Sequence, residues 1–171
     1  MNTDTEREFG DFVAARSDAL CRFAYLLCGD WHRAEDTVQT ALTKLYVAWK
    51  RVHDREAIDG YVRRIIVNVL ASEGRLARFR RERLSGELPD RADGSDFAVS
   101  AHDRMAILQA LATVPPRQRA VIVLRYWEDQ SLEQVAQTLG CSVGTVKSQA
   151  ARGLSTLRQA LGALEPMTSR G

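Results

Sequence analysis

Cysteine, proline and long apolar runs are scarce in this sequence, and each scarcity excludes a class of protein. Only 3 of the 171 residues are cysteine and 4 are proline, which excludes a disulfide-rich scaffold and a collagen. Apolar runs such as Ala120–Leu124 are much shorter than the about 20 residues that cross a bilayer, so we expect no membrane insertion. The opening segment, MNTDTEREF, has neither the basic nor the apolar part of an export signal. These absences predict a cytoplasmic protein.

The three cysteines are interpreted as buried thiols. Cys21 and Cys28 lie seven residues apart in a helical pattern, which separates their backbones by about 10 Å, too far for a disulfide. An odd number of cysteines in a reducing compartment also favours free thiols, Cys141 included. Cys28 and His32 could begin a metal site, but Gly29 interrupts the helix between them and only Cys21 could join them. We therefore expect no metal ion.

In the first half of the chain, apolar residues three and four positions apart predict long helices. The first pattern covers Glu6–Leu27, with a break allowed near Ser17; Gly29 ends it and Asp30 offers the next N-cap. A second helix carries one apolar stripe, and a third pattern continues into the basic end RLARFRRER. Their apolar positions are Val38, Ala41, Leu42, Leu45, Tyr46 and Trp49, then Ile58, Tyr61, Val62, Ile65, Ile66, Val69 and Leu70.

The second half predicts shorter helices, again with recognisable ends. Pro115 and Pro116 end a helix that starts near Met105, and another helix is expected over Gln118–Trp127. Further along, the residues that cap or end helices are Ser131 with Gln134 in a capping box, Gly140, and Ser142, which opens a last helix reaching about Leu164.

A change of composition separates the two halves. From Glu87 to Asp103 there are five acids and one base, and about 17 structureless residues would be long for a loop inside a compact fold. We therefore expect an all-α protein of two small helical domains, 1–84 and 102–171, joined by a flexible acidic linker over 85–101. A solvated loop within a single domain is the alternative.

The most informative segment is SLEQVAQTLGCSVGTVKSQAARGLSTLRQAL. It reads as two helices joined by a tight turn at Gly140, the helix-turn-helix arrangement, whose second helix enters a DNA major groove. Gln bonds adenine, while Lys and Arg bind guanine or phosphate, so the exposed face suits DNA. An ordinary helical hairpin is the alternative. The inward residues are Leu132, Val135, Ala136, Leu139, Val143 and Val146; the candidate DNA-binding residues are Ser142, Thr145, Lys147, Ser148, Gln149 and Arg152.

A second basic feature lies at Arg75–Arg83, which holds five arginines and one acid. It ends a helix, where cations also suit the helix dipole, so a solvated helix end explains it equally well. Beside a DNA-reading helix, however, it indicates a second DNA contact that includes Arg75 and Arg78.

Three segments together resemble an extracytoplasmic-function sigma factor of the sigma-70 class. WHRAEDTVQTALTKLYVAW resembles the family's polymerase-binding segment, and AIDGYVRRIIVNVLASEGRLARFRRER resembles its minus-10 recognition segment. LATVPPRQRAVIVLRYWEDQSLEQVAQTLGCSVGTVKSQAARGLSTLR is similar to its region 4, and the wording SVGTVKSQAARGLS is most like the actinobacterial SigE subgroup. The resemblance covers nearly the whole chain.

The resemblance implies an initiation factor that binds the beta and beta-prime subunits of core RNA polymerase and promoter DNA, duplex and single-stranded. An anti-sigma factor is a further partner that the sequence leaves open. Two of the carried-over residues also have structural explanations, since Leu42 belongs to an apolar stripe and Asn68 could be a satisfied core amide. The implied roles are polymerase binding for Asp36, Gln39 and Leu42, minus-10 binding for Arg63, Arg64 and Asn68, and minus-35 reading for Lys147, Ser148, Gln149 and Arg152. The segment 52–56 would form part of the pocket for a flipped minus-10 base.

This sequence departs from the family pattern at three positions. Tyr61 stands where the family often has Trp, which preserves an aromatic packing role. Gln149 and Ala151 stand where many members carry Arg and a bulkier residue. The residues at 149 and 151 leave the preferred minus-35 sequence open.

Two other classes of function compete with this interpretation. A stand-alone helix-turn-helix repressor would dimerise through its first domain and bind a palindrome without polymerase. An enzyme has little support, because adjacent carboxylates such as Glu35 and Asp36 point to different helix faces and no nucleophile–base grouping is visible. We therefore expect no catalytic residues and no cofactor.

Overall fold

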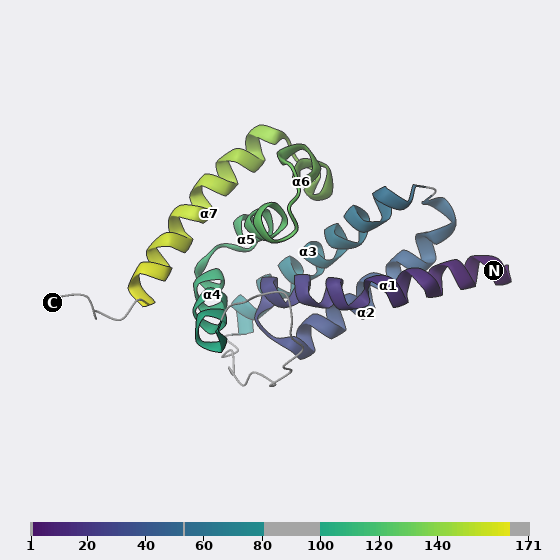
Figure 1. Ribbon diagram of the computed structural model, residues 1–171, viewed down its shortest axis with the longest axis horizontal. Helices are drawn as coiled ribbons and strands as arrows, with labels where there is room; N and C mark the ends of the chain where they lie inside the picture. The colour runs from purple at the N-terminus through teal and green to yellow at the C-terminus, as the bar shows by residue number, and fades with distance from the viewer. Residues whose placement is uncertain (1, 53, 81–99, 165–171) are drawn as a thin grey trace.

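The chain folds into two helical bundles that lie against each other (Figure 1). The computed structural model describes residues 2–52, 54–80 and 100–164, except for the side chains at positions 55 and 75–80. Every regular element among these residues is helical, so the all-α prediction is confirmed. The expected linker lies outside the described residues up to position 99, and Ser100 already caps the next helix. Of the described helices, none is both long and apolar enough to cross a membrane.

The N-terminal bundle contains α1 (Thr3–Cys28), α2 (Trp31–Ala48), a short 3₁₀ turn η1 (Trp49–Arg51) and α3 (Arg55–Arg80). The junction of α1 and α2 forms as predicted. Gly29 has φ 72°, and its N–H donates to the Tyr25 carbonyl at 2.7 Å, which ends α1. The Asp30 side chain then accepts from the Arg33 N–H at 3.0 Å and starts α2.

The break allowed near Ser17 does not occur, because α1 runs without interruption. The Ser17 hydroxyl donates to the Val13 carbonyl, four residues earlier, at 2.6 Å. A serine inside a helix satisfies its hydroxyl in this way without leaving the helix. Ser17 therefore does not interrupt α1.

The C-terminal bundle contains α4 (Ala101–Thr113), α5 (Pro116–Ile122), η2 (Val123–Trp127), α6 (Leu132–Leu139) and α7 (Val143–Leu164). The helix expected over 118–127 is displaced and divided, since α5 begins at Pro116 and ends in the π-helical turn η2. Pro116 occupies the first turn of α5, where its missing N–H costs nothing. Proline therefore ends one helix here and also starts the next.

One apolar core runs through both bundles. Its largest fully buried side chains include Phe23 of α1 and Ile66 of α3 together with Ile122 of α5 and Leu124 of η2. A shared core is a stronger link than the sequence predicted, because two domains on a flexible tether need not touch. The contact between bundles brings α6 and α5 onto α3, and α4 onto α1.

At Gly153, α7 packs against α5 without room for a side chain. A Cβ at this buried position would lie 2.7 Å from Ile122 Cδ1 and 3.2 Å from Gln118 Cβ. We expect Gly153→Leu to destabilise the fold by about 1–3 kcal/mol or more through overpacking, despite leucine's better helix propensity. Gly162→Leu is the matched control, because nothing lies within 4 Å of a Cβ at that exposed position of the same helix. Urea denaturation of both variants checks this, and equal stability would contradict the packing described.

Candidate nucleic-acid interface

The helix-turn-helix forms from α6 and α7 with the predicted chemistry. Ser131 accepts from the Gln134 N–H at 3.1 Å, and the Gln134 side chain accepts from the Ser131 N–H at 2.8 Å, which completes the capping box. Gly140, with φ 66°, closes α6. Ser142 accepts from the Thr145 N–H at 3.1 Å and so caps α7. Val135 and Val146 are buried between the two helices.

The six candidate minus-35 residues lie on the first three turns of α7. Lys147, Ser148 and Arg152 are exposed, and Thr145 and Gln149 are half-buried. The Ser142 hydroxyl is engaged by its capping bond and by a 2.9 Å hydrogen bond with Thr145 Oγ1, so its first role is structural. The long side chains at 147, 149 and 152 are therefore the reading groups that this helix offers.

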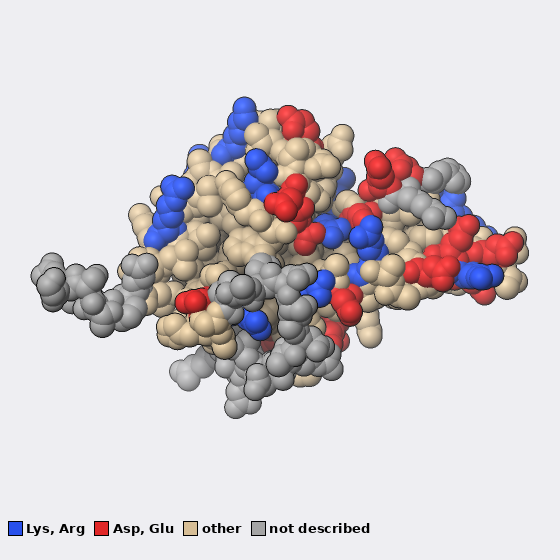
Figure 2. Space-filling view, viewed as in Figure 1, with Lys and Arg blue, Asp and Glu red and all other residues tan. Residues whose placement is uncertain are grey.

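The charge of α7 is of one sign. Its sequence contains Lys147, Arg152 and Arg158 and no acidic residue, and all three cations are exposed. In the space-filling view, blue side chains mark the outer edge of the bundle along α7 (Figure 2). A helix with this composition attracts the phosphate backbone of DNA.

The candidate minus-10 residues on α3 fall into different environments. Asn68 is exposed, so the alternative that it is a core amide is wrong. Arg64 is exposed at the surface, but its guanidinium packs against the α6–α7 turn, where a Cβ on Gly140 would lie 2.7 Å from Nη2. Arg75 and Arg78 belong to α3, and their side chains lie outside the described part of the chain.

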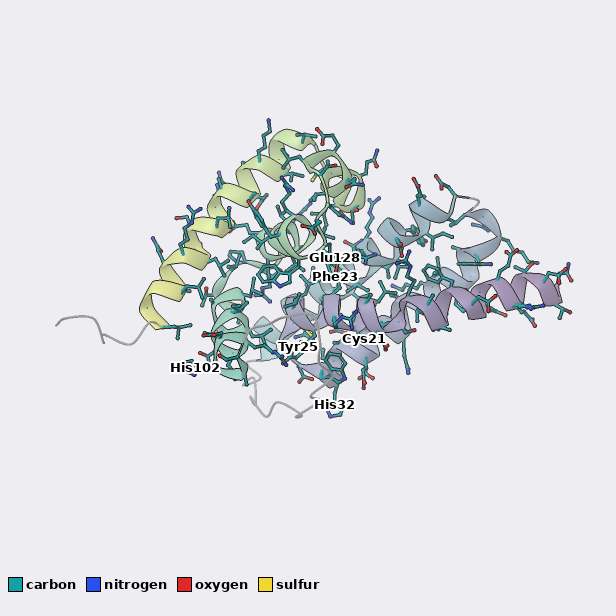
Figure 3. All side chains as sticks on the ribbon, in the orientation of Figure 1. Cys21, Phe23, Tyr25, His32, His102 and Glu128 are labelled. Atoms are coloured by element: carbon teal, nitrogen blue, oxygen red, sulfur yellow. The ribbon has the colours of Figure 1, made fainter. Side chains whose placement is uncertain are left out.

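Arg63 is placed inside the seam between the bundles, where it is only 7% exposed. Its Nε and Nη2 both donate to Glu128 Oε2, at 3.0 and 2.6 Å. Its Nη1 lies 3.6 Å from Asp59 Oδ1, and its Cζ lies 5.6 Å from the centre of the Phe23 ring. Figure 3 shows Glu128 and Phe23 near each other in the centre of the molecule. In this conformation Arg63 is bound to a carboxylate and is not offered to DNA.

Glu128 is the residue that sequence reasoning missed. It follows Trp127 at the end of η2 and is 65 positions from its partner. The sequence contains no periodic or motif signal for such a pairing. Only the packing of the two bundles reveals it.

Two of the three candidate polymerase-binding residues lie on the outer face of α2. Asp36 and Gln39 are exposed and line a shallow hollow together with Thr40, Thr43 and Lys44. The threonine hydroxyls donate back to the carbonyls of Asp36 and Gln39, at 3.0 and 2.8 Å.

Leu42 lies on the apolar side of α2, where it is half-buried and packs against the core. Packing alone thus explains that residue, as the sequence allowed. One turn beyond the hollow, Val47 is 79% exposed and adds an apolar group to the outer face. Its exposure was not evident from the sequence, where it stands beside the apolar stripe.

The C-terminal end of α1 holds the second tie between bundles. The Arg119 guanidinium donates to the Leu27 carbonyl and also, at 2.8 Å, to the Val114 carbonyl of its own bundle. Burial lowers the pKa of Arg119 from its usual value. Burial likewise raises the pKa of the nearby Cys28 thiol, which donates to the Asp30 carbonyl at 3.2 Å. The contacts of Arg119 have a structural role, because the carbonyl groups at the end of a helix attract a cation.

Comparison with known sequences divides the chain at the same place as the bundles. Residues 12–83 match the family described as Sigma-70 region 2, and residues 104–157 match Sigma-70, region 4. The chain is 40% identical over 155 residues to the RNA polymerase sigma-E factor of Streptomyces coelicolor, covering 90% of this chain and 86% of that protein. It is 34% identical over 149 residues to the ECF RNA polymerase sigma factor SigL of Mycobacterium tuberculosis, covering 84% of each.

A solved structure has the same fold. It is the sigma factor RpoE in complex with the anti-sigma factor NepR from Bartonella quintana, with a TM-score of 0.72 and 24% sequence identity. The match covers 93% of this chain and 99% of that one. The arrangement of both bundles is therefore one that a known protein also adopts.

The N-cap of α7 makes a prediction about stability. Ser142→Ala removes the acceptor for the Thr145 N–H and should lower the free energy of unfolding by about 1 kcal/mol. Ser155→Ala, at an exposed interior position of the same helix, should have no such cost and slightly favour the helix. Urea unfolding curves of the two variants distinguish loss of the cap from the mere replacement of serine by alanine. Equal changes in the free energy of unfolding would argue against the cap.

Proposed function

The chain belongs to the sigma-70 family of RNA polymerase sigma factors, in the extracytoplasmic-function group, and on this premise we propose which of its surfaces carries each step of initiation. The outer face of α2 binds core RNA polymerase, α3 binds the minus-10 element, and the first turns of α7 read the minus-35 element. Region 1–84 acts as the melting domain and 102–171 as the duplex-reading domain, with 85–101 as the linker.

The observation that carries this proposal is the exposed start of α7. It joins two cations, Lys147 and Arg152, without an acid to a capped helix N-terminus, so phosphate attraction and base reading come from one element. Lys147 and Arg152 bind phosphate or guanine, and Gln149 bonds adenine. The dimeric repressor is not favoured, because region 2 is a polymerase-binding module and the repressor hypothesis gives it no such role.

Minus-10 recognition requires single-stranded DNA, so the relevant groups must accept unstacked bases and hold phosphates. The exposed amide of Asn68 offers both a donor and an acceptor to a base edge. Arg64, with Arg75 and Arg78 farther along α3, supplies positive charge along the same helix. Binding of bases in the separated strand offsets the cost of unstacking, about a few kcal/mol, so no nucleotide hydrolysis is required.

The protein acts without catalysis of its own and needs neither a metal ion nor a cofactor for these steps. Its place of action is the cytoplasm, where polymerase and chromosome are found. An anti-sigma factor is a candidate regulator, since the solved structure of the same fold is a complex with one.

The test of function is a transcription assay with purified components. The chain and actinobacterial core RNA polymerase are mixed with fragmented genomic DNA, and transcript starts are mapped. We expect starts at a shared two-element promoter only when both proteins are present. Tight binding of the chain alone to a palindrome, with no effect on polymerase, would contradict the proposal and favour a repressor.

Gln149 should set part of the minus-35 preference. Gln149→Ala removes a bidentate contact to a base, so discrimination at one base pair should fall by about 1–3 kcal/mol while polymerase binding is unchanged. Gln159→Ala, at an exposed position two turns and more along α7, is the control. Promoter libraries transcribed with each variant give the measurement. Identical preferences for both variants would remove Gln149 from the reading face.

Asp36 and Gln39 should contribute to polymerase affinity. The double variant Asp36→Ala with Gln39→Ala should weaken binding to core polymerase by about 1–2 kcal/mol, because both side chains line the hollow on α2. Asp18→Ala changes an exposed acid on α1 and should leave affinity intact. Fluorescence titration with core polymerase measures both, and a loss in the control alone would redirect the interface to α1.

A further inference from the structure

A hollow lies at the outer end of the N-terminal bundle, where the start of α1, marked N in Figure 1, meets the connection from α2 to α3. It has a volume of about 520 Å³, within the range of about 300–1,000 Å³ that small-molecule sites occupy. The connection contributes Trp49, Lys50 and Val52 to its lining, and α3 contributes the buried side chain of Ile58. The hollow thus has an aromatic and aliphatic floor beside a cation.

One face of α1 forms the opposite side of the hollow. Thr5 and Glu8, three residues apart, share this face and line the hollow. Phe9 and Phe12 lie beside them and contact the Trp49 ring, with centroid distances of 5.2 and 5.5 Å. These ring contacts hold the start of α1 against η1, so the hollow is built by the packing of two elements.

The polar side chains of the hollow are not used to hold the described part of the fold together. Asn2, which also lines the hollow, starts α1 through its backbone carbonyl, and its side-chain amide makes no capping bond. Glu8 and Lys50 are exposed, and neither forms an ion pair with another described residue. A carboxylate, an ammonium group and an amide are therefore available beside an apolar floor.

The charges on the two sides of the hollow have opposite signs. Residues 3–11 of α1 include four acids and one arginine, and red side chains mark this end of the molecule in Figure 2. Lys50 and Arg51 of η1 supply positive charge on the other side. A phosphate is repelled by α1 and attracted by η1, so the backbone of a single DNA strand can follow η1 while one base points toward α1.

The polar groups of the hollow suit one of the four DNA bases. An unstacked base exposes its Watson–Crick edge, and guanine presents there two adjacent donors, N1–H and the 2-amino group, beside the acceptor O6. One carboxylate accepts both donors, and an ammonium group donates to O6. Cytosine and adenine each offer a single amino group to Glu8, and thymine offers a single N–H. The Trp49 indole supplies a surface on which a base stacks.

We infer that this hollow binds one unstacked guanine of the separated promoter strand, with Glu8 selecting the base, Lys50 donating to O6 and Trp49 stacking on the ring. The inference rests on the proposed binding of single-stranded DNA by the N-terminal bundle. Val52 belongs to the segment that the family resemblance connects with a base pocket, whereas α1 has no DNA contact in the function proposed above. The start of α1 thereby becomes a specificity-determining element.

Glu8→Gln tests the inference by changing the base with which the side chain can pair. The amide accepts one hydrogen bond and donates one, which fits the adenine edge and not the two adjacent donors of guanine. The chain and core RNA polymerase transcribe a promoter library that is randomised over the melted segment. The wild type should favour guanine about tenfold at one position, and Glu8→Gln should favour adenine at the same position.

Glu6→Gln is the matched control, because it makes the same charge change at an exposed position of α1 outside the lining of the hollow. Its base preferences should equal those of the wild type. A switch in Glu8→Gln alone supports the inference, and identical preferences in all three proteins overturn it. Weaker polymerase binding by Glu8→Gln with unchanged base preferences also overturns it, because that result would assign the hollow to a protein partner.

Inosine tests the contact at the level of a single amino group. Replacing the favoured guanine by inosine removes only the 2-amino group, and doing so on each strand in turn identifies the strand that is bound. Transcription by the wild type should fall about tenfold, as for one hydrogen bond to a charged group, and transcription by Glu8→Gln should fall less. Equal falls overturn the role of Glu8.

Failure of this inference differs from failure of the proposed function. Transcript starts by the wild type without a guanine preference in the melted segment overturn the inference and leave the function as a sigma factor intact. The absence of any polymerase-dependent start would contradict the proposed function, and the inference with it.

Discussion

A guanidinium that is 7% exposed must have an anion beside it, and here that anion comes from the other bundle. Leaving Arg63 unpaired would bury an uncompensated charge, at a cost of about 3–5 kcal/mol. Asp59, on the same helix, lies 3.6 Å away and is itself paired with Arg16 at 3.0 Å, so it compensates only in part. Glu128 meets this requirement, and its two hydrogen bonds with Arg63 tie the end of η2 to α3.

The candidate binding residues differ in their exposure to solvent. Lys147 and Arg152 at the start of α7, and Asp36 and Gln39 on the outer face of α2, are exposed to solvent. Arg63, by contrast, is buried and bound to Glu128.

Local chemistry made much of the fold predictable from the sequence. Gly29, Asp30, Ser131, Gly140 and Ser142 act on backbone groups within four residues of themselves, so their roles as caps can be read without knowing the tertiary structure. The break allowed at Ser17 failed for a related reason, since two opposite local outcomes were open to its hydroxyl and the helix-compatible one formed. The exposed face of α7 was likewise predictable, because helical periodicity decides which side chains point outward.

The placement of Arg63 could not be predicted in this way. Its neighbours in sequence, Val62 and Arg64, differ sharply in exposure, which periodicity explains. Periodicity does not say whether the intermediate side of α3 meets solvent or a second bundle. That depends on how Phe23, Ile66 and Ile122 join into one core, a matter of shape across segments far apart in the chain. Arg63, which the family resemblance assigns to DNA, is therefore a residue whose partner depends on tertiary structure, because Glu128 reaches it only through the packing of the two bundles.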